Sequence, residues 1–440
     1  MRSLGLPSVD SLMVGRRVYY GWSIVFGLAA VAMVANAMGG VNFGLFIRPM
    51  REDLGVGDSA FGWAQTARLI GSGVSGWFLG RILDRHGARL PLAVAGAGTA
   101  LFMAGLAWLT QGWQMVALFF VSGFFGLQGG GSLYNTVTLA RWFVRKRGKA
   151  MSIAAMGLPV GIFIFSPVTQ LLIDGVGWRT TWLVLASGGG VIFLVALLII
   201  RRQPQDMGLL PDGDGDDPAA PGSLSADGRQ WTAVAEHAWT RDEAIRSAAF
   251  WRLSAAEGLM MLSMSSLSLF RIPFFQEQGV DPQIVAFALS VEAAASLCGG
   301  IPAGWAVDRF PPRFAAALAA ALMVLSFLAT MAVSADWHVF IAMMLFGIAA
   351  MAMAVTLGVI WPAYFGSENI GGIRGFSMPF ILVLSGLGPP LTGMVRDASG
   401  TYMPAWIGGA IAMTICTLLF LTARKPEPRA TRAGHSALDC

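Results

Sequence analysis

Charged residues are scarce in this 440-residue chain. Lys, Arg, Asp and Glu make up 12% of it, whereas hydrophobic residues make up 55%. Because soluble domains carry about 25% charged residues, this composition excludes an ordinary soluble protein. Cysteine is also rare, and Cys298, Cys416 and Cys440 show neither metal-site spacing nor an even disulfide framework. The sequence therefore predicts no metal and no cofactor.

Catalytic motifs are missing as well. We find no nucleotide-binding loop, metal cluster or nucleophile–base pair, and the triple glycine at 129–131 lacks the Lys-Ser/Thr of a phosphate-binding loop. The net charge of +5 does not indicate a nucleic-acid partner, because the basic residues lie between apolar segments. No cleavage site follows the polar first 18 residues, so we expect no signal peptide. The sequence predicts a membrane protein that is not an enzyme.

Long apolar runs are what the chain has in abundance, and its mean hydropathy is +0.63. Each run is long enough to cross roughly 30 Å of hydrocarbon as a helix. Backbone polar groups cannot stay unpaired in lipid, so we predict an all-α integral membrane fold. Twelve spans are predicted, at 21–46, 60–80, 90–110, 114–140, 149–173, 180–200, 250–272, 283–306, 314–334, 338–362, 373–395 and 403–422.

Lys and Arg gather in alternate loops between these spans. They precede the first span, follow the second, fourth and eighth, and follow the twelfth, whereas the other loops are short and mixed or acidic. Because basic loops stay on the cytoplasmic side, both termini are predicted to be cytoplasmic, in the cell inner membrane.

One polar stretch divides the chain. Residues 203–246 are rich in Pro, Gly, Ser and Asp and have little to bury, so we predict a cytoplasmic linker there. The predicted parts are an N-terminal segment (1–18), a six-helix bundle (19–202), the linker, a second six-helix bundle (247–423) and a cytoplasmic tail (424–440).

A repeat relates the two halves. "GRILDRHGAR" (80–89) and "GWAVDRFPPR" (304–313) share one frame, in which Asp84 and Asp308 are 224 residues apart. Trp182 and Trp406 recur at the same offset. A fixed offset near half the chain length predicts two parallel six-helix halves related by an axis along the membrane normal. Carriers need such halves, because rocking one against the other exposes a central site to each side in turn.

The first loop motif resembles the Gly-x-x-x-Asp-Arg-x-Gly-x-Arg signature of the major facilitator superfamily, and the second is a weaker copy of it. "YYGWSIV" (19–25), "ARWFVRKRGKAMSIAAMGLPVG" (140–161) and "YFGSENIGGIRG" (364–375) resemble the bacterial monocarboxylate and oxalate/formate group. The resemblance implies the major facilitator fold and transport by alternating access.

The loop charges are candidates for a conformational latch. Ion pairs at a membrane–water boundary can hold two halves in one state and break in the other. The alternative is topology alone, with basic residues marking the inner side and an Asp capping a helix. We predict the latch residues to be Asp84, Arg85 and Arg89 in the first half and Asp308, Arg309 and Arg313 in the second.

Polar residues at membrane depth are candidates for binding and coupling, because they are costly there. Arg68 and Arg271 are predicted to bind an organic anion, since the guanidinium fork matches a carboxylate. Glu292 is a candidate proton carrier; alternatively, it is a structural partner of Arg68 or Arg271. Further hydrogen-bonding groups for the substrate are predicted at Asn36, Tyr134 and Asn135.

The chain departs from the resembled group in two places. No arginine follows Glu292 one turn on, and the eleventh span has no lysine. A small monocarboxylate in symport with protons remains the leading prediction, and a larger amphipathic or aromatic compound is the alternative. The predicted partners are that small molecule, a proton and the lipid bilayer, with no nucleic acid.

Overall fold

The computed structural model describes residues 19–37, 42–125, 133–143, 146–209, 239–366 and 369–426. These residues are almost entirely helical, which confirms the predicted all-α class. The N-terminal segment 1–18, most of the linker and most of the tail lie outside the described residues, so their predicted boundaries stay predictions.

The first half contains α1 to α8. Three predicted spans each contain two helices. The first span contains α1 and the start of α2, the fourth contains α5 and α6, and the fifth contains α7 and the start of α8. A straight helix as long as α8 would extend about 63 Å, so α8 covers the end of the fifth span and the whole sixth. Non-helical backbone at Gly177 (φ 81°, ψ 161°) separates its two segments. The bounds are Tyr20–Ala37, Phe43–Leu54, Asp58–His86, Arg89–Ala107, Gly112–Gly123, Leu133–Trp142, Arg147–Ala155 and Gly157–Leu198.

The second half follows a short 3₁₀ turn, η3 (Pro204–Met207), and the small helix α9 (Arg241–Ile245). Six long helices then match the last six predicted spans. They are α10 (Ala248–Glu277), α11 (Pro282–Arg309), α12 (Pro312–Met331), α13 (Asp336–Phe365), α14 (Ile370–Ser399) and α15 (Met403–Thr422). Within the described ranges, eight helical stretches are long and apolar enough to cross a membrane, and two shorter apolar ones lie in α1 and α5.

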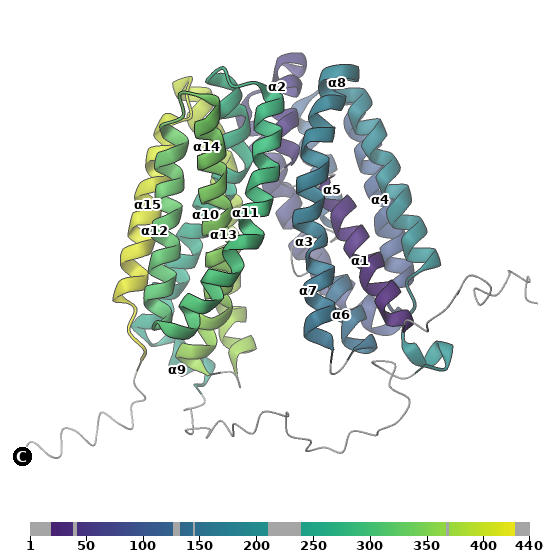
Figure 1. The fold of residues 1–440 in the computed structure, drawn as a ribbon, viewed down its shortest axis with the longest axis vertical. Helices are drawn as coiled ribbons and strands as arrows, with labels where there is room; N and C mark the ends of the chain where they lie inside the picture. Colours follow the sequence, from purple (N-terminus) through teal and green to yellow (C-terminus); the bar gives the residue numbers. More distant parts are fainter. Residues whose placement is uncertain are drawn as a thin grey trace, which may run out of the picture.

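The repeat predicted from the loop motifs reappears in the helix starts. α3 and α11 begin at Asp58 and Pro282, 224 positions apart, and α5 and α13 begin at Gly112 and Asp336, at the same offset. The molecule consists of two six-helix bundles, the first bundle from α1 to α8 and the second from α10 to α15 (Figure 1).

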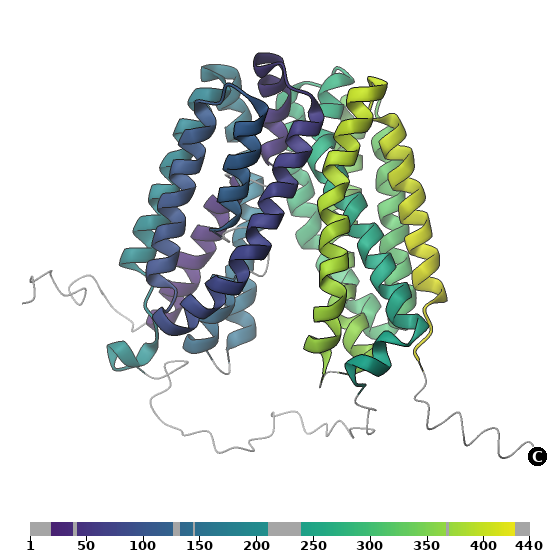
Figure 2. The same cartoon turned by 180° about the vertical axis from the view of Figure 1, so that it is seen from behind.

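The two bundles stand side by side and are not parallel. Their ribbons converge at the end that carries α2, here called the α2 end, and diverge toward the end that carries α9 (Figures 1 and 2). Contacts between the bundles join α3 to α14, α8 to α11, and α2 to α10. The structure is therefore a conformation in which the bundles meet toward the α2 end.

Small residues allow this close approach. A Cβ on Gly62 of α3 would lie 2.6 Å from the carbonyl carbon and oxygen of Pro389, and one on Gly393 of α14 would lie 2.6 Å from the Cα of Ser59. Thr66 donates a hydrogen bond to the carbonyl of Gly386 across the same contact. Glycine at these positions lets the backbones of α3 and α14 touch.

Candidate functional site

The most deeply buried ion pair in the described chain joins α10 to α11. Arg271 Nη2 lies 2.8 Å from Oε1 and 2.7 Å from Oε2 of Glu292. Arg271 is 1% exposed and Glu292 is 7% exposed. The sequence is compatible with either Arg68 or Arg271 as the partner of Glu292, and in the structure the partner is Arg271.

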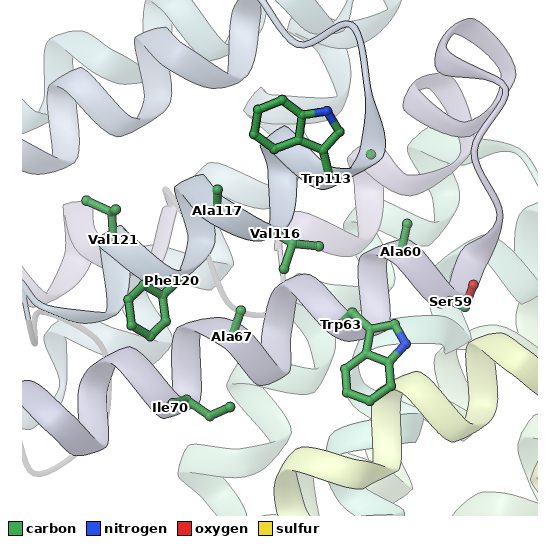
Figure 3. A pocket seen from close by; sticks show the side chains of 11 residues that line it. Ser59, Ala60, Trp63, Ala67, Ile70, Trp113, Val116, Ala117, Phe120 and Val121 are labelled. Atoms are coloured by element: carbon green, nitrogen blue, oxygen red, sulfur yellow. The ribbon is translucent and has the colours of Figure 1, made fainter.

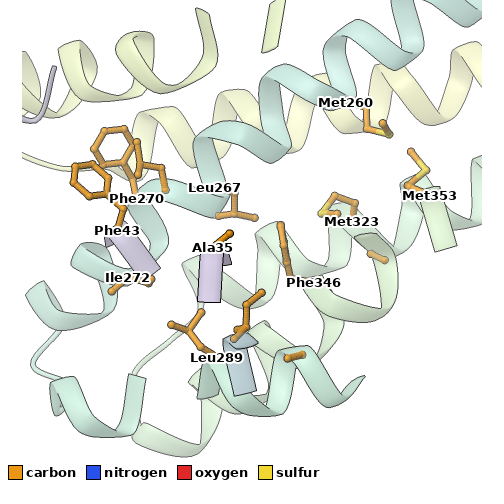
Figure 4. Close-up of a cluster of buried hydrophobic side chains, with 14 of the residues drawn as sticks. Ala35, Phe43, Met260, Leu267, Phe270, Ile272, Leu289, Met323, Phe346 and Met353 are labelled. Carbon is orange, nitrogen blue, oxygen red and sulfur yellow. The ribbon is translucent and has the colours of Figure 1, made fainter. Parts of the chain in front are cut away.

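Part of the Arg271 guanidinium has no partner. Its Nε and Nη1 are buried without a hydrogen bond, and its Cζ lies 3.9 Å from the centre of the Phe346 ring. Phe346 belongs to a buried cluster to which both bundles contribute apolar side chains, among them Ala35, Leu267 and Leu289 (Figure 4). Unsatisfied buried donors are costly, so this guanidinium retains an unused capacity to bind an acceptor.

Glycine also positions Glu292. A Cβ on Gly347 of α13 would lie 2.4 Å from the carbonyl oxygen of Glu292 and 3.1 Å from its Cγ. The absence of a side chain therefore lets α13 pack directly on α11 at the level of the ion pair. The same contact brings α13, with Phe346, against the guanidinium.

Arg68 lies on α3 in the first bundle and is partly buried. The structure gives it no hydrogen bond or ion pair with any described residue. Its helix is held against α5 by two glycines, since a Cβ on Gly123 would lie 2.2 Å from the Arg68 carbonyl oxygen and one on Gly71 would lie 2.2 Å from that of Phe120. Arg68 is thus an uncompensated cation on a firmly packed helix.

The three neutral residues predicted to hydrogen-bond the substrate lie on α6 and α1, and the structure describes the side chains of two of them. Tyr134 is buried on α6 and donates a 2.9 Å hydrogen bond to the carbonyl of Phe125. Asn135 follows it and is partly buried. Asn36 lies in the last turn of α1, and its side chain is outside the described part of the chain. None of these is brought into contact with Arg271 by a described hydrogen bond.

The predicted latch residues lie toward the α9 end. Asp308 and Arg309 are exposed, and the guanidinium of Arg309 lies 5.7 Å from the ring centre of Trp305. Arg313 lies over Phe314, and Arg89 donates to the carbonyl of Leu197 at 2.8 Å. Within the described residues none of these four forms an ion pair. The side chains of Asp84 and Arg85 are outside the description.

A second charged cluster lies at the α2 end, and the sequence analysis did not predict it. We call Arg51, Asp58, Glu277, Arg396, Asp397 and Tyr402 the rim cluster. Glu277 Oε1 of the second bundle accepts hydrogen bonds of 2.9 Å from both Arg51 and Arg396. Arg51 Nη1 also lies 3.3 Å from each carboxylate oxygen of Asp58. These contacts connect the two bundles electrostatically.

Helix ends position the two arginines. α2 ends at Gly55 (φ 63°), whose N–H bonds to the carbonyl of Arg51, and α14 ends at Gly400 (φ 74°), whose N–H bonds to that of Arg396. The left-handed conformation favours glycine, and a cation in the last turn is favoured by the helix dipole. Both guanidinium groups therefore lie at C-terminal ends that face the same rim.

Asp397 supplies a cap for a helix of the other bundle. Its carboxylate accepts from the backbone N–H of Asp58 at 2.8 Å and of Ser59 at 3.0 Å, the first two residues of α3. The residue before α3 is Gly57, which has no side chain to cap the helix. A contact between the bundles thus replaces a local N-cap.

Asp58 is the most enclosed carboxylate of the rim cluster. It precedes the predicted 60–80 span, is 0% exposed, and accepts a hydrogen bond from the Tyr402 hydroxyl. Burial raises the pKa of the Asp58 carboxyl, while Tyr402 and Arg51 oppose that shift. Burial also raises the pKa of the Tyr402 phenol, which therefore stays protonated and donates.

A separate groove lies between α3 and α5 (Figure 3). It has a volume of about 830 Å³, and exposed apolar side chains line it, including Trp63, Ile70, Trp113 and Val121. No charged residue lines it. An organic anion has no counter-charge there, so the groove is not the candidate site.

The rim cluster had a weak signal in the sequence. Glu277 is visible there as an acidic residue of an alternate loop, and Asp397 as the recurrence of Asp174 after the corresponding span, but neither was interpreted as an ion-pairing residue. In the structure Asp174 accepts from Gln170 within its own helix, so the two members of that repeat have different contacts.

Comparison with known proteins gives a family match over nearly the whole chain. The model described as Major Facilitator Superfamily matches residues 28–278 and 253–438. Monocarboxylate transporter 4 of Rattus norvegicus is 22% identical over 95% of this chain and 87% of its own length. Monocarboxylate transporter 13 of Bos taurus is 27% identical over 69% of each chain.

One bacterial relative is named for an aromatic substrate. The 4-hydroxybenzoate transporter PcaK of Pseudomonas aeruginosa is 27% identical over 47% of this chain and 46% of its own. Among solved structures, the nucleoside transporter NupG has a TM-score of 0.70 at 12% identity, covering 93% of this chain and 100% of that one. A bacterial homologue of the lysosomal transporter Spinster, inward-facing and unoccupied, has a TM-score of 0.65 at 15% identity, covering 92% and 95%. These two likenesses establish the fold.

Proposed function

Because this chain belongs to the major facilitator superfamily, whose members are transporters rather than enzymes, we propose that it carries a small organic anion in symport with protons. The proposed substrate class is a monocarboxylate. The observation that carries the proposal is the buried Arg271–Glu292 pair, in which two guanidinium nitrogens, Nε and Nη1, lack an acceptor.

The arginines and the glutamate have different proposed roles. Arg68 and Arg271 bind the substrate carboxylate, and Glu292 takes the proton when the substrate competes with it for Arg271. A carboxylate buried at low dielectric favours its neutral form once its counter-charge is engaged elsewhere. Asn36, Tyr134 and Asn135 hydrogen-bond the uncharged part of the substrate.

The protein is proposed to lie in the cell inner membrane with its α9 end facing the cytoplasm. The support is the distribution of Lys and Arg between the spans. The conformation described here is then closed to the outside. A green fluorescent protein fused after residue 440 is expected to fluoresce, because it folds in the cytoplasm; loss of fluorescence, with activity of a fused alkaline phosphatase, would reverse the assignment.

The loop charges are proposed to latch the α9 end in the opposite conformation. In that conformation Asp84, Arg85 and Arg89 of the first bundle would form ion pairs across the closed α9 end, as would Asp308, Arg309 and Arg313 of the second. Asp308 and Arg309 are exposed in this conformation, in which the bundles are apart at the α9 end. Their exposure supports the proposal, because the ion pairs of the latch are expected to be broken when the bundles are apart there.

Transport by reconstituted protein tests the anion and proton assignments together. Radiolabelled acetate, pyruvate and 4-hydroxybenzoate are offered to proteoliposomes with and without an inward proton gradient. We expect gradient-driven uptake of a monocarboxylate, its loss in Arg68→Gln, and insensitivity to the gradient in Glu292→Gln. Arg179→Gln is the matched control, since that exposed arginine pairs with Asp53 of its own bundle. Uptake that Arg68→Gln leaves unchanged would remove the anion site.

A larger aromatic or amphipathic compound is the second candidate. The contact of the Arg271 guanidinium with the Phe346 ring favours it, because an aromatic carboxylate would find both a cation and a ring there. Similarity to the 4-hydroxybenzoate transporter points the same way. Uptake of 4-hydroxybenzoate in preference to acetate and pyruvate would select this candidate.

A further inference from the structure

The charges of the rim cluster do not balance. Arg51 and Arg396 contribute two positive charges, whereas Asp58, Glu277 and Asp397 contribute three negative ones when ionised. The neighbouring charges compensate each other, because Arg48 pairs with Glu52 and Arg179 pairs with Asp53. α5, which also packs on α3, carries no ionisable side chain. One negative charge in the cluster is therefore in excess.

The three carboxylates are not equally compensated. Glu277 lies between two guanidinium groups at 2.9 Å, and Asp397 accepts two backbone N–H groups at the positive end of α3. Asp58 has only the longer 3.3 Å contacts from Arg51 and the neutral Tyr402 hydroxyl. It is also fully enclosed. Of the three, Asp58 is the carboxylate at which a proton removes the most unfavourable charge.

We propose that Asp58 is a proton-binding residue of the closed α2 end, so that acid on that side favours the conformation in which the bundles meet there. The role proposed for this proton is to set the balance between the two conformations. It is bound and released on the side of the α2 end and is not carried across the membrane. The inference relies on alternating access, a property of the superfamily, and not on any particular substrate.

Linkage gives the direction of the effect. When the bundles separate at the α2 end, Asp58 meets water, where its carboxyl releases a proton more readily. This gain in hydration opposes and exceeds the loss of the Tyr402 hydrogen bond, which favours the ionised carboxylate. The closed conformation therefore binds the proton more tightly than the open one, and closure is favoured as pH falls. A difference of one pKa unit between the two conformations changes their ratio about tenfold across the titration.

Distance measurements without substrate test this inference. Spin labels at Thr110→Cys and Ser334→Cys, two exposed loop positions beside α5 and α13, report the separation of the bundles at the α2 end. The background replaces Cys298 and Cys440 by serine. Between about pH 8 and pH 5 we expect the short-distance population of the unsubstituted protein to grow, and that of Asp58→Asn to stay constant. Asp53→Asn, an exposed carboxylate at the same end, is expected to behave like the unsubstituted protein.

Two charge variants separate proton binding from a purely structural role. Glu277→Gln removes the excess negative charge and should move the pH midpoint of closure downward, whereas Arg396→Gln adds to the excess and should move it upward. A merely structural cluster would lose closure in both variants with no opposite shift. A distance distribution of the unsubstituted protein that ignores pH, or Asp58→Asn that retains its pH response, would overturn the inference while leaving the proposed substrate intact.

Discussion

At the scale of single residues, the Arg271–Glu292 pair makes stability and function separable. Removing one partner of a buried ion pair leaves an uncompensated charge and costs about 3–5 kcal/mol, whereas replacing both by apolar residues is often neutral or stabilising. We expect Glu292→Leu to lower the apparent Tm in detergent, and Arg271→Met with Glu292→Leu to restore it. The double variant should lack anion uptake, because it has lost Arg271. A double variant no more stable than the single one would show that Arg271 is solvated by other means.

Sequence reasoning at this scale found the residues but not their contacts. Arg68, Arg271 and Glu292 were identifiable because charge is rare at membrane depth. That Glu292 meets Arg271 depends on how α10 packs on α11. That no described residue pairs with Arg68 depends on which helices surround α3. Periodicity along one helix does not contain this information. The Asp58–Tyr402 contact joins residues 344 positions apart, so no local pattern indicated it.

At the scale of helices, the contact of α3 with α14 depends on Gly62. A methyl group there would lie 2.6 Å from the backbone of Pro389 and Pro390, which cannot move aside as a flexible side chain can. We expect Gly62→Ala to cost about 1–3 kcal/mol of closure and to lengthen the Thr110–Ser334 label distance. Gly73→Ala is the control on the same helix, because its Cβ would meet only Leu382 at 3.7 Å. Equal distances in the two variants would refute this role of Gly62.

Helix existence was predictable and helix continuity was not. Apolar length located all twelve spans, and the 224-residue offset predicted the paired starts of α3 with α11 and α5 with α13. The predicted first span ends at residue 46, whereas α2 continues to Leu54, because the charged second half of α2 carries no apolar signal. Gly177 was hidden among 55 glycines until its φ of 81° identified it as the break within α8.

At the scale of the whole molecule, the proposed transport by alternating access requires the bundles to separate at the α2 end. A Cβ on Gly386 would lie 3.4 Å from Cγ2 of Thr66, an atom at the γ position that a cysteine sulfur would occupy, so cysteines at these two positions lie within reach of a disulfide. Oxidised Thr66→Cys with Gly386→Cys is therefore expected to stop uptake in proteoliposomes, and a reductant to restore it. The control is Gly105→Cys with Leu118→Cys, which joins α4 to α5 within one bundle. Undiminished uptake by the oxidised Thr66–Gly386 pair would mean that this contact never opens.

Asp397 belongs to one bundle and completes the first turn of a helix in the other. When the bundles separate, the first N–H groups of α3 lose the Asp397 carboxylate as their hydrogen-bond acceptor, and water must replace it. An N-cap acceptor of this kind typically contributes about 1 kcal/mol to helix stability. Folding of α3 and docking of its neighbour are thereby made interdependent. A serine in place of Gly57 would give α3 its own acceptor, and its Cβ would lie 2.6 Å from a carboxylate oxygen of Asp397. Both effects weaken the preference of α3 for the docked arrangement.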